Sequence, residues 1–149
     1  MGDVHARGLS LLDVCDSHSA ELLDYYETFL DEEEGFLEDL NLEMPYGDLL
    51  IIHKIEVNPQ FRGHQLGLLA LLRTIKTFGE GCAMVAIKPF PLQFENKVTD
   101  KNQSKFEAAQ KKLRRYWAKL GFVRFEETDQ YYLDLAYQLP KVNITGFQR

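Results

Sequence analysis

Apolar residues recur at spacings of three and four in three stretches of the chain, which is the pattern of a helix with one buried face. These stretches predict helices that include residues 22–30, 63–78 and 104–120. Asp16 or Ser17 is expected to cap the first helix, and a Ser104–Glu107 capping box the third. Gly79 follows the second helix, at the place of a left-handed C-cap.

Shorter apolar runs predict strands at residues 9–14, 49–57, 82–87, 122–125 and 131–136. Asn58-Pro59 and Lys88-Pro89 end the second and third runs. Residues 90–103 are expected to form a long loop. The polar turn 126–130 is expected to join the last two runs into a hairpin. From residue 49 the order is strand, helix, strand, helix, strand, strand. This order predicts parallel pairing through right-handed crossovers, with an antiparallel hairpin at the edge. We therefore expect a mixed α/β sheet in a single domain over residues 1–149, with a tail at 137–149.

Length and composition are those of one ordinary globular domain: 149 residues, 45% hydrophobic and 27% charged. No apolar run approaches the roughly 20 residues that span a bilayer, and residues 1–7 lack the pattern of a secretion signal. We therefore expect a cytoplasmic protein without membrane association. Cys15 and Cys82, both in predicted strands, are interpreted as small buried hydrophobic residues. Neither the four histidines nor the cysteines have the spacing of metal ligands, so no metal is expected.

Charge is divided unevenly along the chain. Residues 1–48 carry fourteen acidic residues against one basic residue, Arg7, whereas residues 49–149 carry nine acidic and sixteen basic residues. Such a division suits a polyanion on the C-terminal part and a cation beside the N-terminal part. The alternative, that the two parts of one fold attract each other, stays open.

The stretch from Val57 to Gly67 (VNPQFRGHQLG) lies between a predicted buried strand and a predicted helix. A turn of this kind exposes backbone N–H groups at a helix N-terminus, where the helix dipole favours a negative charge. Gly63 and Gly67 allow the main chain to approach a phosphate closely, and Arg62 adds a charged donor. A pyrophosphate is the natural ligand of such a turn, although the two glycines are also compatible with a tight turn alone. The stretch is neither a P-loop nor a GxGxxG fingerprint.

This stretch resembles the acetyl-CoA loop of the GNAT-type N-acetyltransferase superfamily, Arg/Gln-x-x-Gly-x-Gly/Ala after a Val-x-Pro strand end. Val57, Pro59, Arg62 and Gly67 match the pattern, and Gln65 replaces its first glycine. Residues 113–122 are similar to the second signature of the family, a helix that ends in aromatic-x-x-x-Gly-Phe. The resemblance covers residues 49–136 and implies a GNAT-like acyl-CoA N-acyltransferase fold. Fewer elements precede residue 49 than such a fold normally has. Either the N-terminal half is reduced, or the chain is a shortened form of a longer protein.

The resemblance also implies a cofactor and a mechanism. The pantetheine arm of acetyl-CoA would pair with the strand around Ile55, and the amine would attack the thioester once a base has taken its proton. The residues expected to bind the cofactor are Ile55, Glu56, Val57, Arg62, Gly63, His64, Gln65, Leu66, Gly67, Gln110 and Trp117.

His53 lies where several members of the family carry a carboxylate that deprotonates the amine, and histidine is a common general base in enzymes. It is either the base or a strand histidine paired with a neighbour. Glu56 is the alternative base, and strict strand alternation would place it on the opposite face. Trp117 replaces the tyrosine that usually protonates the thiolate, and is interpreted as a packing residue. Tyr116 is a weak candidate for the acid, because it lies about 100° around the helix.

The third helix is strongly basic, which suits the 3′-phosphate of CoA, while most of its charged residues are expected to face solvent. Nucleic acid is not expected as a partner, because the chain is acidic overall. The stretch 88–92 either shapes the acceptor pocket or is a rigid turn. The sequence thus predicts an N-acetyltransferase that acts on a small-molecule or protein amine, cationic in character. The alternative is a noncatalytic acyl-CoA-binding module that keeps the cleft. The oligomeric state stays open.

Overall fold

The structure is a computed structural model that describes residues 10–95 and 97–136. Its α-helices are α2 (Leu11–His18), α3 (Ala20–Phe29), α4 (Leu66–Phe78) and α5 (Gln103–Ala118). Its strands are β1 (Asp48–Ile52), β2 (Cys82–Ile87), β3 (Val123–Arg124) and β4 (Tyr131–Asp134). Short 3-10 turns cover η1 (Glu38–Leu40), η2 (Pro59–Phe61) and η3 (Leu92–Phe94). The predicted tail at residues 137–149 lies outside the described residues.

The strands form one mixed sheet in the order β1-β2-β4-β3. β1 and β2 are parallel, and the hairpin β3–β4 joins the sheet with β4 antiparallel to β2. The prediction of a mixed sheet that ends in an antiparallel hairpin is therefore confirmed.

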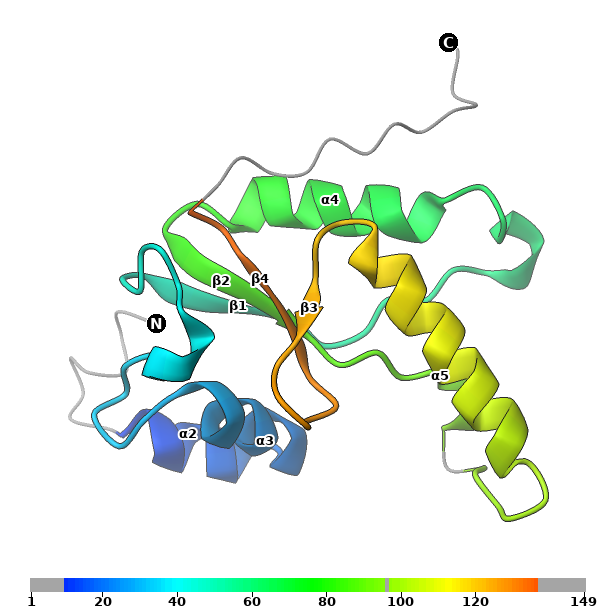
Figure 1. Ribbon diagram of the computed structural model, residues 1–149, viewed down its shortest axis with the longest axis horizontal. Coiled ribbons are helices and arrows are strands. Elements are labelled where there is room, and N and C mark those ends of the chain that lie inside the picture. Colours follow the sequence, from blue (N-terminus) through cyan, green and yellow to red (C-terminus); the bar gives the residue numbers. More distant parts are fainter. Residues whose placement is uncertain (1–9, 96, 137–149) are drawn as a thin grey trace, which may run out of the picture.

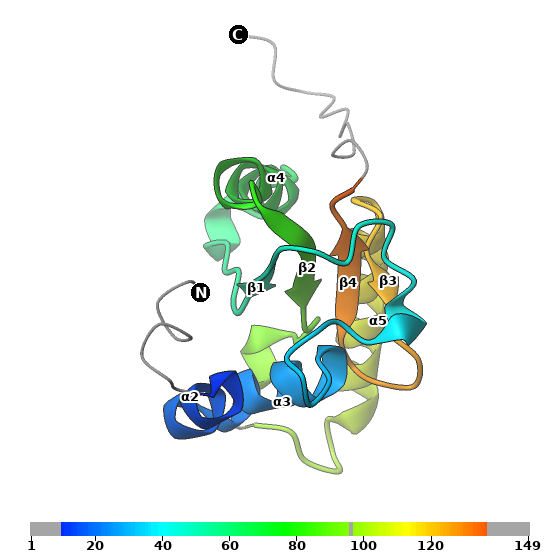
Figure 2. The ribbon, with the colours of Figure 1, turned by 90° about the vertical axis from the view of Figure 1, so that its left-hand side faces the viewer.

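Helices cover both faces of this sheet, so that the described fold has three layers (Figure 1). Side chains alternate along β2: Val85 and Ile87 pack with α4 and α5, whereas Met84 and Ala86 pack with α3 and η1. Figure 2 shows α4 on one side of the sheet and α2 and α3 on the other. Because β2 is buried on both faces, it is a continuous apolar run, as expected for a central strand.

The first predicted strand is wrong, since its described residues belong to helix α2. Leu11 and Cys15 lie four residues apart on one helical face and pack with Tyr26 and Leu30 of the neighbouring segment. A short apolar run does not distinguish a strand from a buried helix turn, and here packing against α3 decides. The cap of α3 is also different from the prediction: Ser19 accepts a hydrogen bond from the amide of Leu22.

The strand predicted at residues 49–57 is much shorter, because β1 ends at Ile52. Its last residue, Ile52, pairs with Ile87, the last residue of β2, and Lys88 and Pro89 follow β2. Proline has no amide hydrogen to continue the ladder, so pairing ends there and residues 53–58 leave the sheet.

The end of the second helix and the starts of two helices are also corrected. Gly79 ends the second helix in a right-handed conformation, with φ −81° and ψ −4°, rather than as the predicted left-handed C-cap. The second helix begins at Leu66 rather than near residue 63, because Gly63 and Gln65 both have positive φ angles that no helix contains. The third helix begins after Asn102 without a side-chain cap. The predicted capping box is absent there, and Glu107 instead accepts a hydrogen bond from the side chain of Gln103.

Within the described residues, no helix is both long and apolar enough to cross a membrane.

Candidate functional site

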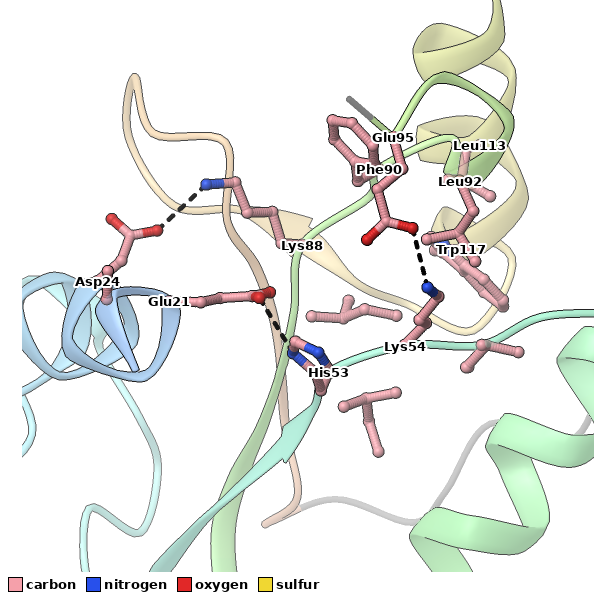
Figure 3. A pocket seen from close by; sticks show the side chains of 14 residues that line it. Glu21, Asp24, His53, Lys54, Lys88, Phe90, Leu92, Glu95, Leu113 and Trp117 are labelled. Atoms are coloured by element: carbon pink, nitrogen blue, oxygen red, sulfur yellow. Dashed lines mark hydrogen bonds and ion pairs between the residues drawn. The ribbon is translucent and has the colours of Figure 1, made fainter. Parts of the chain in front are cut away.

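A pocket of about 550 Å³ opens where β1 and β2 stop pairing (Figure 3). After the last pair, Ile52 and Ile87, the two chains diverge, and helices α3 and α5 complete the walls. The lining residues are Ala20, Glu21, Asp24, Ile52, His53, Lys54, Ile55, Ile87, Lys88, Phe90, Leu92, Glu95, Leu113 and Trp117. Segments far apart in the sequence therefore meet at the carboxyl ends of two parallel strands, a common place for ligands in α/β sheets.

The pocket has a charged side and an apolar side, which Figure 3 shows clearly. Glu21 and Asp24 of α3 lie with His53 and Lys88 on the charged side. On the other side are the apolar residues Phe90, Leu92, Leu113 and Trp117, with the Lys54–Glu95 ion pair beside them. An elongated ligand with an apolar part and a polar end matches this division.

Ion pairs connect the elements around the charged side. His53 Nδ1 lies 3.2 Å from Glu21 Oε2, and Lys88 Nζ lies 3.2 Å from Asp24 Oδ2. Both pairs join the acidic N-terminal part to the basic C-terminal part. Some of the opposite charges therefore attract each other within the fold, which is the alternative left open by the sequence. At the rim, Lys54 Nζ lies 3.1 Å from Glu95 Oε2.

Asp24 is held from a second direction by Gln130, a glutamine that is only 1% exposed. The Gln130 side-chain amide donates to Asp24 Oδ2 at 2.9 Å and to the Asp24 carbonyl at 3.1 Å. It also contacts Thr28 Oγ1 at 3.0 Å. These contacts fix α3 against the β3–β4 turn, so the acidic face of α3 has a defined place beside the pocket.

The two candidate bases differ in position. His53 lines the pocket, while Glu56 is exposed and is not among the lining residues. The expected alternation does not apply, because His53, Lys54 and Ile55 follow the end of β1 and all three line the pocket. Among the described residues, the main chain of residues 54–56, beyond the last pair of the sheet, makes no backbone hydrogen bond, which leaves its amides and carbonyls available to a ligand.

The turn that follows is partly satisfied by its own side chains. Asn58 Oδ1 accepts from the amide of Gln60 at 3.2 Å, and Arg62 Nε donates to the Val57 carbonyl at 2.9 Å. Gly63 has a φ angle of 87°, and a Cβ atom added there would meet nothing within 4 Å. Glycine at this position therefore allows the positive φ angle, and the space where a side chain would lie is open.

The N-terminus of α4 carries free and occupied amides. The amide of Leu68 donates to the Tyr116 hydroxyl at 3.1 Å. For residues 63–67, no amide has a hydrogen-bond acceptor within the described part of the chain. Gln65 reaches this turn with a φ angle of 57°, a conformation that costs a residue with a Cβ atom roughly 1–2 kcal/mol.

Comparisons with protein-family models, with curated proteins and with solved structures find no match. The site is therefore interpreted from its own geometry.

Gly67 lets helices α4 and α5 approach closely. A Cβ atom at this position would lie 3.3 Å from the Tyr116 hydroxyl and 3.6 Å from the Trp117 ring. Trp117 is 4% exposed, belongs to the core and also lines the pocket. One indole thus connects the pocket to the start of α4, which agrees with its interpretation as a packing residue.

The other candidates on α5 lie away from the pocket lining. Gln110 is half-buried and does not line the pocket. Lys119 Nζ lies 5.7 Å from the centre of the Tyr116 ring, and Arg114 pairs with Asp129 at 2.9 Å. Most other basic residues of α5 are exposed, as expected for a solvated face.

Burial raises the pKa values of a tyrosine near the pocket and of both cysteines. Burial raises the pKa of Tyr25, and the neighbouring carboxylates of Glu21 and Asp24 raise it further, so this phenol stays protonated beneath the acidic face. Burial also raises the pKa of the Cys15 and Cys82 thiols, which keeps both as weakly reactive thiols. Cys15 is in a helix rather than in the predicted strand. No cluster of three potential metal ligands occurs among the described residues.

Sequence reasoning missed Glu21 and Asp24. They are spaced by three on a helix, so they share one face, and this spacing was visible in the sequence. No local pattern indicates that this face pairs with His53 and Lys88, because both lie far from α3 in the sequence.

Proposed function

We propose that the protein transfers an acetyl group from acetyl-CoA to an amine, as the resemblance to GNAT-type N-acetyltransferases implies. The observation that carries the proposal is the divergence of β1 and β2 beyond Ile52 and Ile87, with a pocket between them. A pantetheine arm is narrow, mostly apolar and carries two amides. It matches a slot with an apolar wall and a main chain, along residues 54–56, that makes no backbone hydrogen bond within the described part of the chain.

The start of α4 supports the same orientation of the cofactor. The free amides of residues 63–67 and the positive end of the helix dipole favour an anionic group. The two terminal nitrogens of Arg62 have no partner among the described residues and can donate to a phosphate. Trp117 lines the pocket and also packs beside Gly67, so the turn and the pocket lie on either side of one indole.

His53 is the base in this proposal. It takes a proton from the amine nitrogen as that nitrogen bonds to the thioester carbon. The carbon–sulfur bond then breaks, and the leaving thiolate takes a proton from solvent, since Tyr116 is not among the residues that line the pocket. The carboxylates of Glu21 and Asp24 suit an acceptor that carries positive charge.

Other observations favour the alternative, a noncatalytic acyl-CoA-binding module. Arg62 contacts its own turn, the Tyr116 hydroxyl occupies one helix amide, and Trp117 offers no acidic proton to a thiolate. These features weaken the case for phosphate binding at the turn and for protonation of the leaving thiolate. They do not affect the pocket itself, so acetyl-CoA binding and acetyl transfer require separate tests.

A free-thiol release assay with acetyl-CoA and a panel of cationic amines tests turnover. We expect His53→Ala to lower kcat by about 10²–10⁴-fold, the usual contribution of a general base, with little change in acetyl-CoA affinity. His18→Ala, an exposed histidine at the end of α2, is the matched control and should keep full activity.

Unchanged kcat in His53→Ala would show that His53 is structural. Acetyl-CoA binding without thiol release from any amine would favour the noncatalytic module.

A further inference from the structure

The carboxylate of Glu21 lies beside the proposed base, and nothing in the fold requires it there. The Glu21–His53 pair is 39% and 68% exposed, and exposed pairs contribute only about 0–1 kcal/mol to stability. Burial of the α3 face rests instead on Tyr25, Tyr26 and Phe29. The pair therefore calls for a role other than holding the fold together.

The contact determines which ring nitrogen of His53 can act. Glu21 Oε2 lies 3.2 Å from Nδ1, and the negative charge of a carboxylate, which can only accept a hydrogen bond, favours the Nδ1–H form of the neutral ring. Nε2 then keeps the lone pair, and it has no partner among the described residues. Since His53 lines the pocket, this nitrogen is the one available to a ligand.

Glu21 is itself held in place. It lies in the first turn of α3, where the helix dipole favours an ionised carboxylate and Ser19 caps the chain. One turn later, Asp24 fixes the same face through Lys88 and Gln130. The carboxylate is therefore positioned from a rigid element rather than from a loop.

We infer that Glu21 is a positioning residue for His53: it holds the imidazole as the Nδ1–H tautomer, directs Nε2 to the acceptor amine and stabilises the imidazolium that forms. This inference rests on the proposed acetyl transfer. The amine proton moves to Nε2 as the nitrogen–carbon bond forms and the carbon–sulfur bond breaks, and it returns to solvent after the thiolate has left. The charged groups facing His53 across the pocket are Glu21 and Asp24 from α3, Lys88 after β2 and the Lys54–Glu95 pair at the rim.

The first test needs no activity. In ¹⁵N-labelled full chain at mildly alkaline pH, the ring nitrogen shifts of His53, assigned with His53→Gln, report its tautomer. We expect the Nδ1–H form in the wild type and a shift toward the Nε2–H form in Glu21→Ala. Glu27→Ala, an exposed glutamate on the same helix, should leave the tautomer unchanged. An Nε2–H tautomer in the wild type would overturn the inference, even if acetyl transfer itself is established.

The second test measures turnover in a double-mutant cycle. Glu21→Gln removes the charge at nearly constant shape, and it should lower kcat by about 10–100-fold with unchanged KM for acetyl-CoA, while Glu21→Asp should recover part of the loss. In a His53→Ala background, Glu21→Gln should have no further effect, because the two residues act as one unit. Equal losses from Glu21→Gln in both backgrounds would overturn the inference. A wild type that shows the expected tautomer but never releases thiol would instead contradict the proposed function.

Discussion

The pocket and the turn after it are neighbours in the sequence, yet they satisfy their polar groups in opposite ways. In the pocket, the main chain of residues 54–56 makes no backbone hydrogen bond with the described residues, and the charged groups meet from separate elements. In the turn, Asn58, Arg62 and Tyr116 already satisfy part of the main chain. The comparison teaches that the place proposed for the pantetheine arm is open, whereas the place proposed for the diphosphate is partly occupied by the chain itself.

The largest effect should come from filling the pocket. Leu113 is half-buried in the apolar wall, and Leu113→Trp would place an indole in the space proposed for the pantetheine arm. We expect acetyl-CoA affinity to fall by at least about 100-fold, or roughly 2.7 kcal/mol, in calorimetric titration. Ala108→Trp, on the exposed face of the same helix, is the control and should bind normally. Equal affinity in Leu113→Trp would place the arm elsewhere.

An intermediate effect is expected where the turn meets α5. Gly67→Leu would force a side chain against Tyr116 and Trp117, where even a Cβ atom is only 3.3 Å from the hydroxyl. Overpacking of this kind costs about 1–3 kcal/mol of unfolding free energy, measurable by urea denaturation. Gly63→Ala is the contrasting variant, because its Cβ atom meets nothing and only the φ angle of 87° opposes it. A fully stable Gly67→Leu would mean that the two helices do not depend on this contact.

The smallest effect concerns the position where the resemblance fails. Gln65→Gly removes a left-handed residue with a Cβ atom, a gain of roughly 1–2 kcal/mol, which is partly offset by glycine's extra chain entropy of about 0.5–1 kcal/mol. We expect a net stabilisation of about 0.5–1 kcal/mol in urea denaturation, with acetyl-CoA affinity equal or higher. Ala70→Gly, at an exposed position inside α4, should instead lose about 1 kcal/mol. A clear loss of stability in Gln65→Gly would show that the glutamine side chain supports the turn.

Local sequence patterns predicted much of the C-terminal fold. The run 82–87 is apolar throughout because β2 is buried on both faces, and the helix ending at Phe78 shows its period because one face packs on the sheet. The hairpin also follows from a short polar turn between two apolar runs. Each of these elements is determined by residues close together in the chain.

The misses in the sheet, in the first predicted strand and in the site depend on packing partners elsewhere in the chain. β1 ends at Ile52 because its register places Ile87 opposite, just before Pro89. Residues 11–18 are helical because Leu11 and Cys15 pack against α3. For the site, the sequence indicated His53 and the α4 turn, but the acidic partners on α3 became visible only when tertiary packing brought them to the pocket.

The most direct test of the central claim is a crystal structure of the protein with acetyl-CoA. The account predicts the pantetheine arm between residues 53–57 and 88–92, against Leu113 and Trp117, with the diphosphate at the amides of residues 63–67. Acetyl-CoA bound outside this pocket, or a pocket that stays empty at saturating acetyl-CoA, would contradict it.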